Sequence, residues 1–149
     1  MVRDYTTRRT SIVEALVDKL KGINGTGQFF SDVAGNVSPR LRFWDEVEEF
    51  PAIHLNAGSE TREYQGGGYK DRFLNLSVRC YVNQEDATLA LDQLLEDIET
   101  VIEDNSRLEY LDKRGVPQYT QQISIISIDT DEGVLEPLGV GELLLQVQY

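Results

Sequence analysis

The chain has 149 residues, the size of a single domain that can bury a hydrophobic core without disulfide or metal support. Its 26 acidic residues outnumber its 14 Lys and Arg residues, and the net charge of −12 opposes binding to nucleic-acid phosphates. With one Cys and one His, the chain can form neither an internal disulfide nor a zinc site made of Cys and His ligands.

The charge is unevenly distributed along the chain. Residues 1–42 contain seven bases and four acids, a net +3, whereas residues 43–149 contain seven bases and 22 acids, a net −15, and the two sum to −12. No apolar run is long enough to span a membrane, and the first residues lack the charged-then-apolar pattern of a signal peptide. We therefore expect a protein without a membrane span that stays in the compartment where it is made.

The first predicted element is a helix. Asp4 is a candidate N-cap, and Gly22 follows the helix as a stop signal. Arg8 and Arg9 lie in the early turns, where the helix dipole disfavours cations, so they form either a solvated pair or a contact with a partner. The apolar positions lie on two adjacent rows, at Ile12, Val13, Leu16, Val17 and Leu20.

A long connection with little regular structure is expected from residue 22 to residue 39, because it contains four glycines and several small polar residues. Residues 40–44 are a candidate short strand, and residues 45–50 form an acidic loop before Pro51.

A long hairpin follows. Its first strand has Ile53, Leu55 and Ala57 on one face and His54 and Asn56 on the other. Its second strand, within residues 69–82, has five inward positions at Leu74, Leu76, Val78, Cys80 and Val82. The tip, residues 59–72, has too few apolar residues for a core, which predicts an arm reaching beyond it, with a flexible loop as the alternative. The residues expected to contact another subunit are Tyr64, Gln65, Gly66, Gly67, Gly68 and Tyr69.

The next segment is an amphipathic helix that should lie on the apolar face of the preceding strand. Its stripe consists of Leu91, Leu94, Leu95, Ile98, Val101 and Ile102. Residues 85–104 contain eight acids and no Lys or Arg, which indicates an anionic outer face. Four of these acids lie toward the C-terminal end of the helix, namely Glu96, Asp97, Glu99 and Glu103.

The remainder of the chain predicts more strands. Residues 107–111 are a candidate short strand before a turn at 113–117, and residues 122–129 form a strand. The apolar phase of that strand shifts between Ile125 and Ile126, which indicates a β-bulge there or burial of both faces. A glycine-containing loop at 131–141 leads to the last strand at 142–149.

These elements predict an α+β fold. A single mixed or antiparallel sheet of about four to five strands, built from two hairpins, carries two main helices on one face. The opposite face should be polar or meet a partner, because it carries Arg79, Tyr81, Gln146 and Gln148.

No stretch of the sequence indicates catalysis, a cofactor or a metal. His54 has no visible nucleophile beside it, and Cys80 is expected to be a buried hydrophobe rather than a reactive thiol. The segment 129–133 differs from a calcium loop, because its Gly comes one place early and Val140 occupies the position that requires Glu. The segment 66–71 lacks the Ser or Thr and the strand-to-helix setting of a phosphate loop. We expect a protein that is not an enzyme.

Several segments of the chain match a known pattern. They are Phe50-Pro51-Ala52-Ile53, Gly58-Ser59-Glu60-Thr61-Arg62-Glu63-Tyr64, Gly66-Gly67-Gly68, the acidic helix and the final run from Gly139 to Tyr149. Together they resemble the tail terminator proteins of long-tailed (siphovirus-type) bacteriophages. The resemblance covers most of the chain, with 22–44 and 105–120 matching least.

The resemblance implies a structural virion protein whose residues 1–149 form one domain with a protruding hairpin arm at about 59–72. It implies a hexameric ring that caps the tail tube, ends tail polymerisation and offers a surface for head–tail joining. The implied partners are other copies of the chain, the tail tube protein and the head–tail connector protein. Genomic DNA would only pass through the channel, which the candidate acids Glu96, Asp97, Glu99 and Glu103 would face. No cofactor or membrane is implied. The implied location is the head-proximal end of the virion tail, after assembly in the host cytoplasm.

Two alternatives stay open at this point. A head completion or connector adaptor of the neck shares small α/β architectures and ring assembly. An enzyme or small-ligand binder would instead need convergent carboxylates in a closed cleft.

Overall fold

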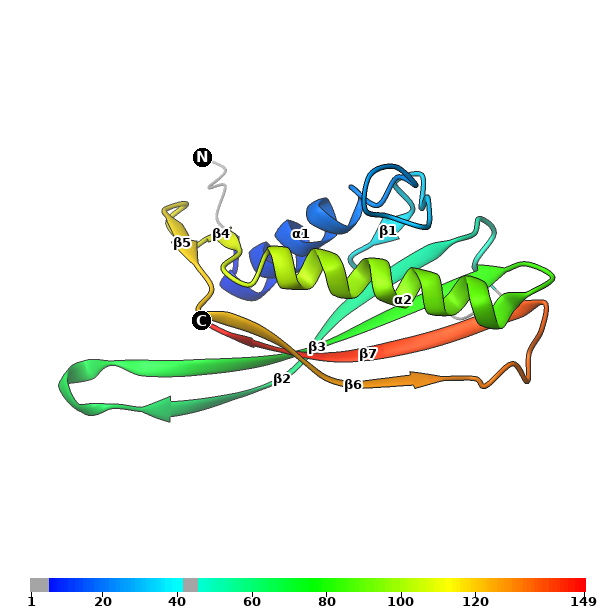
Figure 1. Cartoon of the computed structure of the whole chain (residues 1–149). Helices are drawn as coiled ribbons and strands as arrows, with labels where there is room; N and C mark the ends of the chain where they lie inside the picture. Colours follow the sequence, from blue (N-terminus) through cyan, green and yellow to red (C-terminus); the bar gives the residue numbers. More distant parts are fainter. Residues whose placement is uncertain (1–5, 42–45) are drawn as a thin grey trace.

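The computed structural model describes residues 6–41 and 46–149, and it confirms the α+β fold (Figure 1). Two helices lie on one face of a five-stranded sheet of order β1-β2-β3-β7-β6, and β4 pairs with β5 in a small second sheet. The elements are α1 (Arg8–Leu20), β1 (Val37–Ser38), β2 (Ala52–Tyr64), the 3-10 turn η2 (Gly66–Gly68), β3 (Lys70–Asn83), α2 (Ala87–Asp104), β4 (Glu109–Leu111), β5 (Pro117–Tyr119), β6 (Gln122–Thr130) and β7 (Leu138–Gln148).

The sheet consists of the two expected hairpins side by side. The β2–β3 and β6–β7 hairpins join through antiparallel pairing of β3 with β7, and β1 makes the sheet mixed because it runs parallel to β2. All inward positions of β3 are buried, and so are those of β7 at Leu143, Leu145 and Val147. The apolar stripe of α2 covers them, so the alternation and the stripe together form the core.

The N-cap of α1 differs from the prediction. The Thr7 side chain accepts a hydrogen bond from the Thr10 amide at 3.0 Å, so the helix begins at Arg8, while Asp4 lies outside the described residues. The strand expected at 40–44 largely falls on residues 42–45, also outside them. The structure instead places a short strand at Val37–Ser38, paired with Ile53 and His54.

The predicted bulge in β6 is confirmed. Ile125 pairs with Leu145, and the next pair is Ser127 with Leu144, so Ile126 is the extra residue. The turn expected at 113–117 is present, since the amides of Val116 and Arg114 both bond to the Asp112 carboxylate. The short strand β5 that follows it was not predicted.

The last strand starts earlier than expected, because two glycines assigned to the loop belong to β7. A Cβ on Gly139 would lie 2.7 Å from Val82 Cγ2. A Cβ on Gly141 would lie 3.0 Å from Cys80 Sγ and 3.2 Å from Leu91 Cδ1. These glycines allow α2 to approach the strand, which is a packing role rather than a turn role.

The open face of the sheet is less exposed than predicted near one end. His54 and Tyr81 lie on that face as expected, but their exposed fractions are only 3% and 2%, with ring centroids 5.3 Å apart. Arg79, farther along β3, forms an ion pair with Glu142 at 3.3 Å. His54 therefore lies on the predicted face but is buried rather than exposed, since strand alternation assigns a face but not what covers it.

Candidate functional site

The β2–β3 hairpin extends well beyond the helices as a narrow arm (Figure 1). Pairing continues to Tyr64 and Lys70, and the Gln65 amide bonds to the Tyr69 carbonyl at 2.7 Å. Gly67 and Gly68 have φ values of 79° and 83°, so the glycines permit the left-handed backbone of the turn. The arm is thus an ordered hairpin rather than an irregular loop.

The tip of this arm is aromatic. Tyr64 and Tyr69 are each 74% exposed, and Lys70 Nζ lies 5.8 Å from the Tyr64 ring centroid. The structure therefore brings all six predicted arm residues together at the tip, where they contact none of the core.

The arm leaves the core at a bulge in β2, between Ala57 and Glu60. The side chain of Arg9 donates a hydrogen bond to the Gly58 carbonyl, and Asn75 Nδ2 donates to Ser59 Oγ at 3.0 Å. Arg9, in the early turns of α1, therefore links this helix to the base of the arm within the chain itself.

A second set of contacts fixes the arm from the C-terminal side. The Tyr149 hydroxyl donates to a Glu60 carboxylate oxygen, and Arg62 Nε lies 2.8 Å from the other oxygen. The backbones of Arg72 and Tyr149 exchange hydrogen bonds of 3.1 and 2.9 Å, and the Arg72 guanidinium lies 5.5 Å from the Tyr149 ring centroid. We call Arg9, Glu60, Arg62, Arg72 and Tyr149 the arm clamp.

The clamp shifts the pKa values of Glu60 and Tyr149. Burial raises the pKa of Glu60, but the hydrogen bonds from Tyr149 and Arg62 outweigh it and bring the pKa below its ordinary value of 4.5. Burial, followed by the hydrogen bond to the Glu60 carboxylate, raises the pKa of Tyr149. Near neutral pH the Glu60 carboxylate is therefore ionised and the Tyr149 phenol is protonated.

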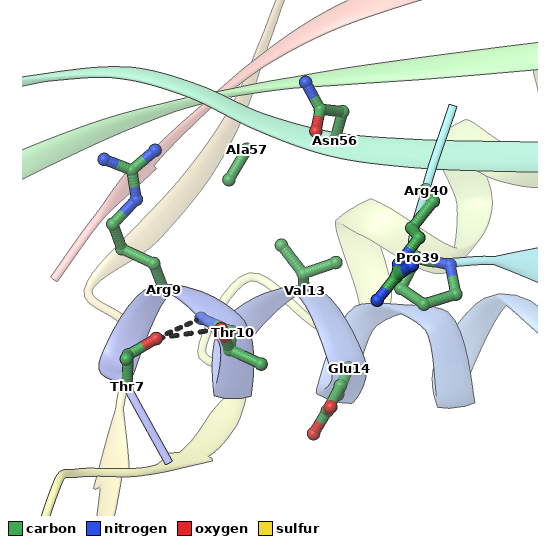
Figure 2. Close-up of a pocket in the computed structure, with 9 residues that line it drawn as sticks. All are labelled: Thr7, Arg9, Thr10, Val13, Glu14, Pro39, Arg40, Asn56 and Ala57. Atoms are coloured by element: carbon green, nitrogen blue, oxygen red, sulfur yellow. Dashed lines mark hydrogen bonds between the residues drawn. The ribbon is translucent and has the colours of Figure 1, made fainter. Parts of the chain in front are cut away.

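A groove of about 390 Å³ lies between α1 and β2, beside the base of the arm (Figure 2). Arg9 extends from α1 toward the strand, whereas Glu14 points away from it. Among the described residues that line the groove there is no His, no Cys and a single carboxylate, so these residues form neither a nucleophile–base pair nor an acid/base pair. The lining residues are Thr7, Arg9, Thr10, Val13, Glu14, Pro39, Arg40, Asn56 and Ala57.

The rest of the described chain offers no better chemical site. Within residues 6–41 and 46–149, no group of three His, Cys, Asp or Glu side chains is placed to hold a metal ion. Burial raises the pKa of Cys80 to about 12, so its thiol stays protonated. Neither described helix is both long and apolar enough to cross a membrane.

The acidic surface of α2 is present, with one correction. Glu96 and Glu103 are exposed and Glu99 is half-buried, but Asp97 is fully buried. Its two carboxylate oxygens accept hydrogen bonds from the amides of Phe30 and Ser31 at 3.0 and 2.7 Å. Asp97 therefore holds the 22–36 connection against α2 and cannot belong to an exposed acidic surface.

A signal for Asp97 exists in the sequence. It lies three residues after Leu94 and four before Val101, so it borders the apolar stripe rather than the outer face. The arm clamp has no such signal, because Arg9 and Glu60 meet partners 49 and 89 residues away in the chain. Sequence reasoning found the arm but not what fixes its direction.

Two sequence comparisons with known proteins agree on one family. The family model described as Bacteriophage Tail Tube Terminator Protein matches residues 6–149. The chain is 34% identical over 149 residues to the tail tube terminator protein p142 of Escherichia phage T5, covering 95% of this chain and 92% of that protein. A chain from the virion of a native gene transfer agent particle has the same fold, with a TM-score of 0.51, 7% identity and 93% of both chains covered. The chain therefore belongs to the bacteriophage tail tube terminator protein family.

Proposed function

We propose that this protein closes the head-proximal end of a phage tail tube as a ring, stops tube growth and presents a surface for head–tail joining. The observation that carries this proposal is the ordered arm, which projects from a compact core and has two exposed tyrosines at its tip. Membership of the terminator family supports the same role. The proposed partners are the tail tube protein and the head–tail connector protein, and the role requires no catalysis.

The ring would form from head-to-tail contacts between identical copies. Such contacts join two different surfaces, and they close into a ring when the rotation between neighbours divides a full turn. We assign the arm, residues 59–72, to one of these surfaces, with Tyr64, Gln65, Gly66, Gly67, Gly68 and Tyr69 at the contact. The arm clamp supports this assignment, because an arm of fixed direction loses little conformational entropy on binding. Six copies are expected from the family resemblance.

A test of the arm is to delete residues 64–69. We expect the shortened chain to keep its circular dichroism spectrum, because none of these residues lies in the core, and to lose ring formation on tails. A deletion chain that still formed complete rings would remove the arm from the assembly mechanism.

We further propose that Glu96, Glu99 and Glu103 face the channel of this ring. Negative charge on the wall would repel passing DNA and keep it from binding there. Asp97 is not part of this proposal, because it is buried. Replacing the three glutamates by Lys should leave rings intact and slow DNA ejection, and unchanged ejection kinetics would contradict the channel position.

The decisive experiment for the function is electron microscopy of particles from a phage with a nonsense mutation in this gene. Tubes of irregular, excessive length without attached heads are the expected result. Tails of normal length beside heads that leak or fail to join would assign the protein to the neck connector instead.

A further inference from the structure

We propose that the arm tip binds a defined receptor on the next copy of the chain, formed by the end of β6, the β6–β7 loop and the first turn of α2. This inference rests on the proposed ring and names the second surface that each head-to-tail contact needs. We call this second surface, on the end of β6, the β6–β7 loop and the first turn of α2, the receptor end.

The receptor end exposes large apolar side chains that have no role in the core. Val134 is 81% exposed and Leu89 53%, while Ile128 and Leu135 are each 43% exposed. Figure 1 shows the β6–β7 loop and the start of α2 at the opposite end of the molecule from the arm tip. Several exposed apolar side chains on adjoining elements indicate an interaction surface.

The loop that carries two of these residues is held in place. The Leu135 amide bonds to Asp131 Oδ2 at 3.2 Å, and the Asp131 amide bonds to the Val140 carbonyl at 3.0 Å. Thr88 Oγ1, in the first turn of α2, donates to Glu136 Oε1 at 3.0 Å. The apolar side chains are thus presented by an ordered loop, which lowers the entropy cost of binding.

The two ends of the molecule are complementary in charge and character. Residues 128–136 contain four acids and no base, whereas residues 64–70, at the end of the arm, contain one Lys and no acid and are flanked by Glu63 and Asp71. The tip adds two tyrosines, a residue type enriched among the energetic centres of protein interfaces, and Lys70 beside the Tyr64 ring. An aromatic tip that carries a lysine therefore matches an apolar, acidic receptor end. Two tips, or two receptor ends, would match each other less well.

The position of the two surfaces fits a ring. The tip and the receptor end lie at opposite ends of one chain, so each copy can offer its tip to one neighbour and its receptor end to the other. A tip of about seven residues is also small against the roughly 800 Å² per partner of a stable interface. We therefore expect the contact to form when copies are brought together on the tube.

The test uses disulfide crosslinking in assembled particles. Cys80 is buried with a protonated thiol, so cysteines introduced by Gln65→Cys at the tip and Val134→Cys at the receptor end provide the reactive pair. Oxidised particles carrying both substitutions should give a ladder of linked chains on a non-reducing gel. Each single substitution alone should give no ladder.

A matched control places the second cysteine elsewhere. Val116→Cys lies in the β4–β5 turn, where the side chain is 48% exposed, and together with Gln65→Cys it should give no ladder. The proposal would be overturned if this control gave a ladder as strong as that of the Gln65→Cys, Val134→Cys variant. It would also be overturned if the Gln65→Cys, Val134→Cys variant gave no ladder in particles with normal tails. The tail lengths of the nonsense mutant test termination independently of the crosslinking. If those tails are abnormally long but no ladder forms, only the assignment of the receptor end is rejected.

A charge exchange gives a second, independent readout. Lys70→Glu should lower the ladder yield several-fold in the Gln65→Cys, Val134→Cys background, because it places an acid against an acidic surface. Adding Glu132→Lys should restore the yield. If Lys70→Glu leaves the ladder yield unchanged, the electrostatic part of the contact is contradicted. If the yield falls but Glu132→Lys fails to restore it, Glu132 is not the partner of Lys70.

Discussion

The buried carboxylate of Asp97 offers the sharpest test of how the structure is held together. Asp97 lies on α2 and bonds to the amides of Phe30 and Ser31, which belong to the connection between α1 and β1. We consider Asp97→Asn, which keeps the size of the side chain but replaces one acceptor oxygen by an NH₂ donor. That donor would face a backbone amide that also donates.

The expected loss can be estimated from these two bonds. A hydrogen bond to a charged group contributes about 1.5–3 kcal/mol, and a buried donor left without a partner costs about 1–3 kcal/mol. The amide side chain introduced by Asp97→Asn would keep one weaker bond and lose the other, so we expect a loss of about 2–4 kcal/mol. For a domain of this size, each 1 kcal/mol lowers the melting temperature by roughly 2–4 °C, which gives a decrease of about 4–16 °C.

Thermal and urea unfolding followed by circular dichroism would measure this loss. The control is Glu96→Gln, one residue away on the exposed face, which should change stability by no more than about 0.5 kcal/mol. Amide hydrogen exchange of Phe30 and Ser31 should also accelerate in Asp97→Asn. If Asp97→Asn and Glu96→Gln melted at the same temperature, the role assigned to the buried carboxylate would be refuted.

Two further predictions concern stability. Gly139→Ala should destabilise by about 1–3 kcal/mol, because the new Cβ would lie 2.7 Å from Val82 Cγ2, whereas Gly66→Ala, with nothing within 4 Å, should be close to neutral in the same urea titration. Tyr149→Phe should cost about 1.5–3 kcal/mol near neutral pH, since it removes a hydrogen bond to the ionised Glu60. The lowered pKa of Glu60 stabilises the fold above its ordinary value of 4.5, and this contribution disappears as the pH falls through the native pKa. The stability gap between wild type and Tyr149→Phe should therefore narrow in acid, and a gap independent of pH would contradict the role of Glu60.

Most secondary structure could be predicted because local periodicity reports burial directly. The alternation in β3 and the stripe of α2 predict which faces form the core. The phase shift between Ile125 and Ile126 even locates the bulge, since one extra residue restores the pattern. The arm follows from the same reasoning, because a polar, glycine-containing tip cannot be part of a core.

Other features depend on partners that no local pattern reveals. Gly139 and Gly141 have the composition of a turn, yet they lie in a strand because α2 packs against their backbone. His54 alternates outward along β2, but it is buried against Tyr81 of the neighbouring strand. In each case a second element, distant in sequence, decides the environment.

By itself the sequence determined the class of the fold and the acidic character of α2, because each follows from continuous segments. It predicted an arm at 59–72, with a flexible loop as the alternative. Only the tertiary structure decided which acids stay exposed and which way the arm points. Asp97 is removed from the acidic surface by a connection more than 60 residues earlier in the chain. The direction of the arm depends on Arg9 and Tyr149, near opposite ends of the sequence, which meet its base only in the folded chain.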